Sequence, residues 1–239
     1  MTALELRADD VVFGYGDSEV VQGVDFAATA GALTAIVGPN GSGKSTLLKG
    51  LVGLLRPKRG RVSLDGRDVT GVDTSDLVRI GVGYVPQVKN VFPALTVREN
   101  LEIGASTCRR RFKERLAIVE ELFPDLAEGT GKRAGVLSGG QRNMLALARA
   151  LMTDPKLLLV DEPTAGLSPI YSTAVWEHLL RIVGRGIGVV IVEQNTRAAL
   201  ELAERAYLLV GGRVAFTGSA RELASDGELV RTYLGGETR

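Results

Sequence analysis

The chain has 239 residues, which suits one large domain or a core with a modest insert. Its 29 basic and 28 acidic residues give a formal net charge of +1, so no global field recruits nucleic acid or anionic lipid. Cys108, the only cysteine, excludes an intramolecular disulfide framework, and no apolar run approaches the ~20 residues that span a bilayer.

The first third of the chain predicts strands around one helix. We expect no signal peptide in residues 1–7, which lack a long apolar core, and a reducing cytoplasm is the natural compartment. Alternating apolar and polar residues within 1–30 predict antiparallel strands, as at 11–15 and 23–26. A buried strand at 33–37 runs into a glycine-rich turn, and a helix follows at 45–55, ending before Pro57. A strand at 61–64 precedes the turn Asp65-Gly66.

From about residue 88 to residue 154 helical patterns dominate, at 97–103, 112–122 and 141–152, which indicates a helical insert. Short buried strands return at 157–160 and 189–192, with a helix at 171–183 between them. Strand, helix and strand in that order predict a parallel sheet with a right-handed crossover. A hairpin at 207–216 turns over Gly211-Gly212, and residues 219–239 predict a terminal helix.

The turn after the strand at 33–37 fits the phosphate-loop pattern G-x-x-x-x-G-K-[ST]. Its residues are Gly38, Pro39, Asn40, Gly41, Ser42, Gly43, Lys44 and Ser45. Glycines allow successive backbone N–H groups to wrap phosphates. Lys44 should reach the β- and γ-phosphates of a nucleotide, and Ser45 should ligate Mg²⁺.

Two adjacent carboxylates, Asp161 and Glu162, end the buried strand at 157–160. Asp161 at the carboxyl end of this strand is suited to hold Mg²⁺, directly or through water, and Glu162 to activate an attacking water. The alternative is a solvated turn. The phosphate loop upstream favours the catalytic interpretation.

A glycine pair opens the helix expected after residue 138, in the segment Leu137-Ser138-Gly139-Gly140-Gln141. Interior helical glycines each cost about 1 kcal/mol relative to alanine, so a close approach by a ligand or another backbone is one explanation. The N–H groups and the dipole of a helix start suit an anion. The alternative is a capping box, because Ser138 and Gln141 fit S-x-x-Q.

A phosphate loop and an acidic strand end leave GTPases, kinases and helicases open, but no guanine-reading N-K-x-D motif is present. With residues 137–141 and the run Asp161-Glu162-Pro163-Thr164, the chain resembles the ATP-binding cassette (ABC) family over nearly its whole length. The resemblance implies one α/β cassette over 1–239. A RecA-like parallel-sheet core with an N-terminal antiparallel β subdomain would span 1–87 and 155–239, and an α-helical subdomain 88–154.

The resemblance also implies the ligands, ATP and Mg²⁺, and assigns further positions. Gln87 falls where the family has a glutamine that touches Mg²⁺, and Tyr15 where an aromatic ring stacks on adenine. On sequence alone Gln87 is an ordinary surface glutamine, and for Tyr15 the alternative is a core tyrosine. Further nucleotide contacts are implied for the phosphate loop and Thr46, and for Ser138, Gly139, Gly140 and Gln141, which in the family face the nucleotide of a partner subunit.

Two positions depart from the family pattern. Gln194 stands where the family usually has a histidine, and Ser168 where it usually has an aspartate. Gln194 is able to bridge the γ-phosphate and Glu162, but it cannot become cationic and does not titrate. The only histidine, His178, lies within the helix at 171–183 and is expected to be structural or solvated.

The runs at 192–195 and 166–169 and the ending Tyr233-Leu234-Gly235 resemble one branch, the shorter ATPase subunit of branched-chain (hydrophobic) amino-acid importers. The implied partners are a second ABC ATPase subunit (the same or a different chain), two multi-spanning permeases and, indirectly, a solute-binding protein, but no nucleic acid. The implied location is peripheral, on the cytoplasmic face of the inner membrane. Alternatives are a transporter of urea, an amide or an exported cargo, and a soluble ABC ATPase.

Overall fold

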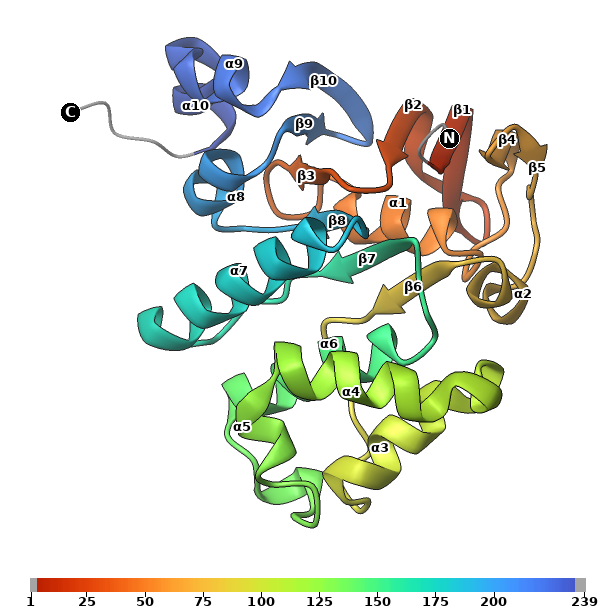
Figure 1. Ribbon diagram of the computed structural model, residues 1–239. Coiled ribbons are helices and arrows are strands. Elements are labelled where there is room, and N and C mark those ends of the chain that lie inside the picture. Colours follow the sequence, from red (N-terminus) through yellow and green to blue (C-terminus); the bar gives the residue numbers. More distant parts are fainter. Residues whose placement is uncertain (1–3, 235–239) are drawn as a thin grey trace.

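Two β-sheets and a group of helices make up the computed structural model, which describes residues 4–234 (Figure 1). The smaller sheet is antiparallel in the order β2-β1-β4-β5, with β1 (Glu5–Tyr15), β2 (Ser18–Thr29), β4 (Arg59–Leu64) and β5 (Arg67–Asp68). The antiparallel strands predicted for this part of the chain are confirmed, but β1 and β2 are longer than expected. Bulges interrupt their pairing, and Asp10 has a φ of +47°, so the apolar alternation breaks inside one continuous strand.

The larger sheet has the order β10-β9-β3-β8-β7-β6. Its strands are β3 (Leu33–Val37), β6 (Val82–Val85), β7 (Leu157–Asp161), β8 (Gly188–Val192), β9 (Arg205–Val210) and β10 (Arg213–Ser219). All neighbours pair in parallel except β9 and β10, which form the predicted hairpin. Sequence analysis missed β6, because four residues that include a glycine carry too little pattern.

Both faces of the larger sheet are buried at its central strands β3, β7 and β8, whereas the edge strand β10 has no buried residue. Along β7, Leu157 and Leu159 face one hydrophobic cluster, and Leu158 and Val160 face the other. Continuous apolar runs are typical of parallel strands covered on both sides. The sheet therefore fixes the carboxyl ends of its strands between two layers of packed side chains.

Helices cover both faces of this sheet. The helix α1 (Lys44–Leu51) packs between the two sheets, and α7 (Pro169–Gly184) and α8 (Thr196–Leu202) pack on the opposite face. The short helix α2 (Thr74–Arg79) contacts β6. The expected helix at 45–55 is too long: α1 ends at Leu51 because Gly53 turns with a φ of +74° directly against the carbonyl oxygen of Val72.

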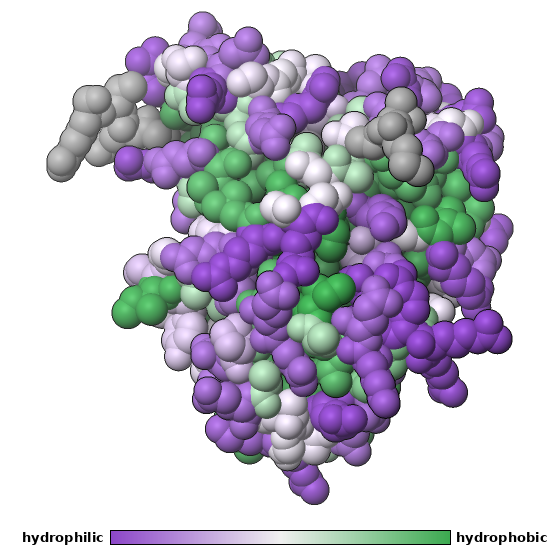
Figure 2. Space-filling model, viewed as in Figure 1, coloured by the Kyte–Doolittle hydropathy of each residue, from purple (hydrophilic) through white to green (hydrophobic). Residues whose placement is uncertain are grey.

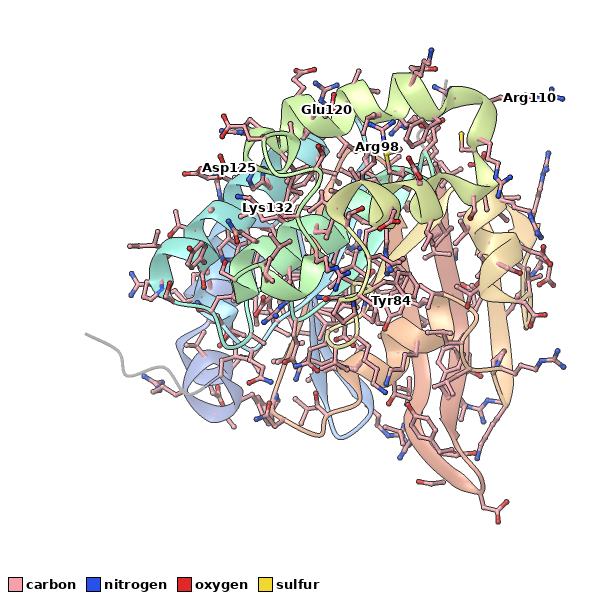
Figure 3. All side chains as sticks on the ribbon, turned by 90° about the horizontal axis from the view of Figure 1, so that it is seen from below. Tyr84, Arg98, Arg110, Glu120, Asp125 and Lys132 are labelled. Carbon is pink, nitrogen blue, oxygen red and sulfur yellow. The ribbon has the colours of Figure 1, made fainter. Side chains whose placement is uncertain are left out.

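The helices between β6 and β7 form a separate lobe, below the sheet in Figure 1 and nearest the viewer in Figure 3. They are α3 (Val97–Gly104), α4 (Phe112–Leu122), α5 (Pro124–Ala127) and α6 (Gly139–Leu151), with 3-10 turns at Ala105–Thr107, Arg109–Arg111 and Ala134–Val136. In Figure 3, Arg110 points away from the molecule at one end of this lobe. The predicted boundaries at 88 and 154 stay predictions, but two non-glycine residues with positive φ, Lys89 (+53°) and Asp154 (+59°), lie beside them.

Ion pairs fasten one end of the lobe. Arg115 is buried, and its Nη1 lies 2.7 Å from a carboxylate oxygen of Asp154, while its Nη2 donates to the carbonyl oxygen of Leu151. Arg111 pairs with the other oxygen of Asp154. A buried guanidinium with a carboxylate partner is costly to separate, so α4 and the end of α6 are held together.

Two short helices, α9 (Ala220–Ser225) and α10 (Gly227–Tyr233), replace the single terminal helix expected within 219–239. Asp226 ends the first and caps the second, because its side chain accepts hydrogen bonds from the backbone N–H groups of Glu228 and Leu229. The rest of that expected helix, 235–239, lies outside the described residues.

The surface is mostly hydrophilic on the face seen in Figure 2, with hydrophobic residues in separate patches. Within residues 4–234, the most exposed large hydrophobic side chain is Ile170 in the first turn of α7, at 81%. None of the helices in this described part has the length and apolar content needed to cross a membrane.

Gly50→Ala should destabilise the fold by roughly 1–3 kcal/mol, because a Cβ there would lie 2.4 Å from Cζ of the fully buried Phe13. Gly184→Ala is the matched control. It closes α7 with nothing within 4 Å of the added carbon, and should be neutral or stabilise by up to ~1 kcal/mol. Urea unfolding of both variants provides the comparison, and a native-like midpoint for Gly50→Ala would contradict this packing.

Candidate active site

The phosphate-loop turn joins β3 to α1 and depends on glycine geometry. Gly38, Gly41 and Gly43 have φ values of 144°, 77° and 99°. A Cβ on Gly38 would lie 2.0 Å from the carbonyl oxygen of Leu209, so no other residue fits there. Gly43 caps α1 without a side-chain hydrogen bond, and the first turn of α1 holds no acidic residue. The N–H groups at this helix start are therefore suited to an anion.

Two buried side chains of the loop, a lysine ammonium and a serine hydroxyl, indicate that the loop binds an anion. The Nζ atom of Lys44 donates to the carbonyl oxygens of Gly38 and Pro39 at 2.8 and 2.9 Å. Burial lowers the pKa of Lys44, and the carboxylates of Glu162 and Asp161 oppose that shift. The buried Ser42 Oγ has no hydrogen-bond partner in residues 4–234. A buried hydroxyl without a partner is uncommon, and a phosphate oxygen would supply one.

A cavity of about 330 Å³ opens beside this loop, within the size range of ligand pockets. It brings together predicted site residues from three separate stretches of sequence. The lining residues are Val20, Asn40, Gly41, Gly43, Lys44, Ser45, Thr46, Glu162 and Gln194. Val20 was missed by sequence analysis, since an apolar residue within a strand carries no functional signal.

The predicted adenine contact, Tyr15, does not line this cavity. Tyr15 ends β1 beside the β1–β2 turn, and it is 50% exposed. A ring with this exposure is not packed in the core, and its face is open to stacking. The structure thus excludes the core-tyrosine alternative, while the adenine contact stays a prediction.

Glu162 is held by two glutamine side chains. Its Oε2 atom accepts hydrogen bonds from Nε2 of Gln87 at 2.6 Å and from Nε2 of Gln194 at 2.8 Å. Its backbone has a φ of +46° and donates to the carbonyl oxygen of Val192 at 2.9 Å. A non-glycine residue in this region is strained, and such strain is concentrated at functional sites. The three predicted catalytic residues therefore meet at one carboxylate oxygen.

Asp161 and Ser45 form the other pair of the site. Ser45 Oγ donates to Oδ1 of Asp161 at 2.9 Å. Burial raises the pKa of Asp161, and the Ser45 hydrogen bond opposes the rise. Residues 4–234 hold no cluster of three or more His, Cys, Asp or Glu side chains able to bind a metal. A hydroxyl, one carboxylate and the side-chain oxygen of Gln87 fit Mg²⁺, which keeps several waters and uses substrate phosphates as ligands.

A third buried carboxylate beside Asp161 and Glu162, that of Glu193, was missed by sequence analysis because an acidic residue after a strand resembles a solvated turn. It is only 2% exposed. Its Oε1 accepts from the backbone N–H and the hydroxyl of Thr164, at 2.9 and 2.7 Å, and its Oε2 from the backbone N–H of Gln194. Burial raises the pKa of Glu193. These bonds tie the segment after β7 to the segment after β8, so Glu162 and Gln194 are positioned together.

The glycine pair lies at the start of α6, away from the cavity. The capping box is present, since Ser138 Oγ accepts from the Gln141 N–H and the Gln141 side chain accepts from the Ser138 N–H. A Cβ on Gly140 would lie 2.5 Å from the ring of Tyr171, whereas one on Gly139 would meet only Leu167 at 3.6 Å. Packing therefore accounts for Gly140. The implied contact of these residues with a partner's nucleotide stays a prediction.

The two remaining residues singled out by sequence do not line the cavity either. The His178 ring stacks on Phe123 with a centroid distance of 4.5 Å, and burial lowers the pKa of His178. Its structural role is thereby confirmed. Ser168 precedes α7, and its side chain makes no capping hydrogen bond.

This arrangement has the parts needed to hydrolyse a nucleoside triphosphate. It has a loop of N–H groups with a lysine for the phosphates, a hydroxyl–carboxylate pair for Mg²⁺, and a fixed carboxylate for water. All lie at the carboxyl ends of neighbouring parallel strands, where α/β folds bind ligands.

Comparison with known families supports the same chemistry. The family model for ABC transporters matches residues 21–165. The chain is 40% identical over 232 residues to a probable branched-chain amino acid transport ATP-binding protein, LivF, of Archaeoglobus fulgidus, covering 96% of this chain and 98% of that protein. It is 33% identical to the lipopolysaccharide export system ATP-binding protein LptB of Haemophilus influenzae, covering 96% and 97%.

Among solved structures, a nucleotide-free ATP-binding cassette from an ABC transporter superposes with a TM-score of 0.86 at 28% identity. The superposition covers the whole of both chains. The sheet order and the helical lobe described above are therefore those of an ATP-binding cassette.

Proposed function

Because this chain belongs to the ABC transporter family of ATP-binding proteins, we propose that it powers the uptake of branched-chain or related hydrophobic amino acids. Hydrolysis of ATP coupled to transport is the activity of the family. The observation that carries the proposal is the Glu162 carboxylate, held by Gln87 and Gln194 beside the phosphate loop.

The solute assignment rests on similarity to the archaeal amino-acid transport protein. The similarity to LptB keeps an exported cargo as the second candidate. Urea or an amide would fit the same resemblance. A soluble ABC ATPase acting on nucleic acid is disfavoured by the net charge of +1.

ATP binding begins at the phosphate loop. The loop N–H groups and Ser42 Oγ bind phosphate oxygens, and the Lys44 ammonium leaves its two carbonyl acceptors for the β- and γ-phosphates. Exchange of neutral carbonyls for charged phosphate strengthens the hydrogen bonds of the lysine. Tyr15 stacks on adenine, and Val20 packs against the nucleotide from β2.

Hydrolysis follows from the geometry around Glu162. Its carboxylate accepts a proton from the attacking water, while Gln87 and Gln194 fix the direction in which it points. Ser45, Asp161 and Gln87 would hold Mg²⁺, which neutralises phosphate charge when bound. Gln194 also lies where it is able to donate to the γ-phosphate, but as a neutral amide it adds no positive charge.

ABC ATPases act as pairs and assemble with membrane permeases. In such a pair, the start of α6 (Ser138, Gly139, Gly140 and Gln141) faces the ATP of the partner, and the partner's equivalent segment completes the site described here. The subunit then lies at the cytoplasmic face of the membrane, bound to two permeases that receive solute from a binding protein.

Replacing Glu162 by Gln should leave ATP binding intact and reduce turnover by ~10²–10⁴-fold, the usual contribution of a general base. The amide oxygen still accepts the hydrogen bonds of Gln87 and Gln194, so the site keeps its shape. Equilibrium ATP binding and phosphate release measure the two effects separately. A closed, ATP-bound pair should accumulate, and unchanged turnover would remove Glu162 from the mechanism.

Gln194→His should keep or raise ATPase activity in the assembled transporter. An imidazole N–H is able to replace the amide donor to Glu162, and a protonated ring adds positive charge near the γ-phosphate. Gln194→Leu, which has no donor, is the matched loss control. Steady-state turnover measures both variants, and a loss beyond ~100-fold in Gln194→His would show that the amide has a specific role.

Co-expression with candidate permeases tests the solute. The chain should co-purify with two multi-spanning subunits, and ATPase activity in vesicles should rise when a binding protein loaded with leucine, isoleucine or valine is added. The same vesicles with empty binding protein, or with the Glu162→Gln chain, are the controls. Stimulation by an unrelated cargo alone would contradict the amino-acid assignment while leaving the ATPase intact.

A further inference from the structure

Asn143 of α6 forms hydrogen bonds with two segments outside its own helix. It lies in the second turn of α6, and its Nδ2 donates to the carbonyl oxygen of Pro163 at 2.8 Å. Its Oδ1 accepts from Nδ2 of Asn90 at 2.9 Å. Pro163 directly follows Glu162, and Asn90 is three residues after Gln87. One side chain thus touches the segments on both sides of the Gln87–Glu162 hydrogen bond.

The direction of this chain of hydrogen bonds is fixed by chemistry. The Pro163 carbonyl only accepts, so the amide nitrogen of Asn143 must face it. The amide oxygen of Asn143 then faces Asn90, whose nitrogen must donate. An aspartate at 143 would turn a second acceptor toward Pro163, and an alanine would reach neither group.

The same residues lie around one small gap. A small gap of about 10 Å³ is lined by Gln87, Asn90, Asn143 and Glu162, among other residues. At this gap Glu162 is buried, Asn90 and Asn143 are half-buried, and Gln87 is exposed. Asparagine is also a weak helix former, and α6 is otherwise rich in leucine and alanine. Contacts outside the helix therefore explain its presence better than helix formation does.

We propose that Asn143 is a positioning residue that links the start of α6 to Glu162, so that the half-site offered to a partner controls hydrolysis at this chain's own ATP. The inference rests on the proposed function, in which Ser138–Gln141 engage the nucleotide of the partner. Movement of α6 on that engagement shifts the Asn143 amide, which carries the Pro163 carbonyl and the Asn90 side chain with it. The Glu162 carboxylate and the Gln87 amide are thereby set together for the attacking water.

The test separates binding, pairing and turnover. Asn143→Ala should keep the ATP dissociation constant of the single chain, because Asn143 does not line the phosphate-loop cavity. In a Glu162→Gln background it should still form the closed pair with ATP, measured by size-exclusion chromatography with light scattering. In the otherwise native chain, turnover should fall roughly 10-fold, the size expected for the loss of one net hydrogen bond.

Three further variants make the result specific. Asn143→Asp should match Asn143→Ala, because it too loses the donor to Pro163, whereas Asn90→Ala should lose less, because the Pro163 bond remains. Asn100→Ala controls for general weakening of the lobe, because within residues 4–234 the Asn100 side chain bonds only Phe92 and Thr96. It should lower the unfolding temperature, but it should not combine reduced turnover with intact ATP-dependent pairing.

Two outcomes would overturn the inference. If ATP-dependent pairing and turnover fall together, Asn143 acts only through the half-site that α6 offers to the partner. If turnover is native in both Asn143 variants, Asn143 does not link α6 to Glu162. If the Glu162→Gln chain forms no ATP-dependent pair, alone or with a second cassette, the proposed function itself fails. That result is recognisable without any change at Asn143.

Discussion

The site depends on one constraint, the fixed position of Glu162 at the end of β7. A buried parallel strand delivers the residue, its positive φ turns the chain away from the sheet, and two amides hold the carboxylate. Gln87 comes from the segment after β6 and Gln194 from the segment after β8, the two strands that flank β7. The catalytic side chains thus meet because their strands are neighbours, although the sequence separates them widely.

Those parts of the site that depend on a local sequence pattern could be predicted. The glycines that adopt positive φ in the phosphate loop form a recognisable pattern in the sequence, and an apolar run ending in two carboxylates identifies β7. Glu193, Val20 and Asn143 could not be found in this way. Their importance comes from burial or from partners far along the chain, and a single sequence shows neither. The predicted end of α1 was wrong for a similar reason. The helix stops at the contact between Gly53 and Val72, which no local pattern reveals.

The start of α6 shows how two explanations of a motif can both apply. The capping box satisfies the backbone of the helix, and Gly140 makes room for the Tyr171 ring. Neither fact requires a ligand, and neither prevents one from binding. Gly139 is the informative residue, since its packing would accept a methyl group and packing alone leaves its identity unexplained.

The two residues with left-handed backbone at the edges of the helical lobe have a consequence for variation at these positions. The chain enters the lobe beside Lys89 and leaves it beside Asp154, and both have positive φ. A β-branched residue would fit this conformation poorly, whereas glycine would adopt it without strain. At Asp154 glycine would sacrifice the ion pairs with Arg111 and Arg115, but the exposed Lys89 forms no ion pair within residues 4–234. Of the two, Lys89 is therefore the position where glycine would relieve the backbone strain at an edge of the lobe without the loss of an ion pair.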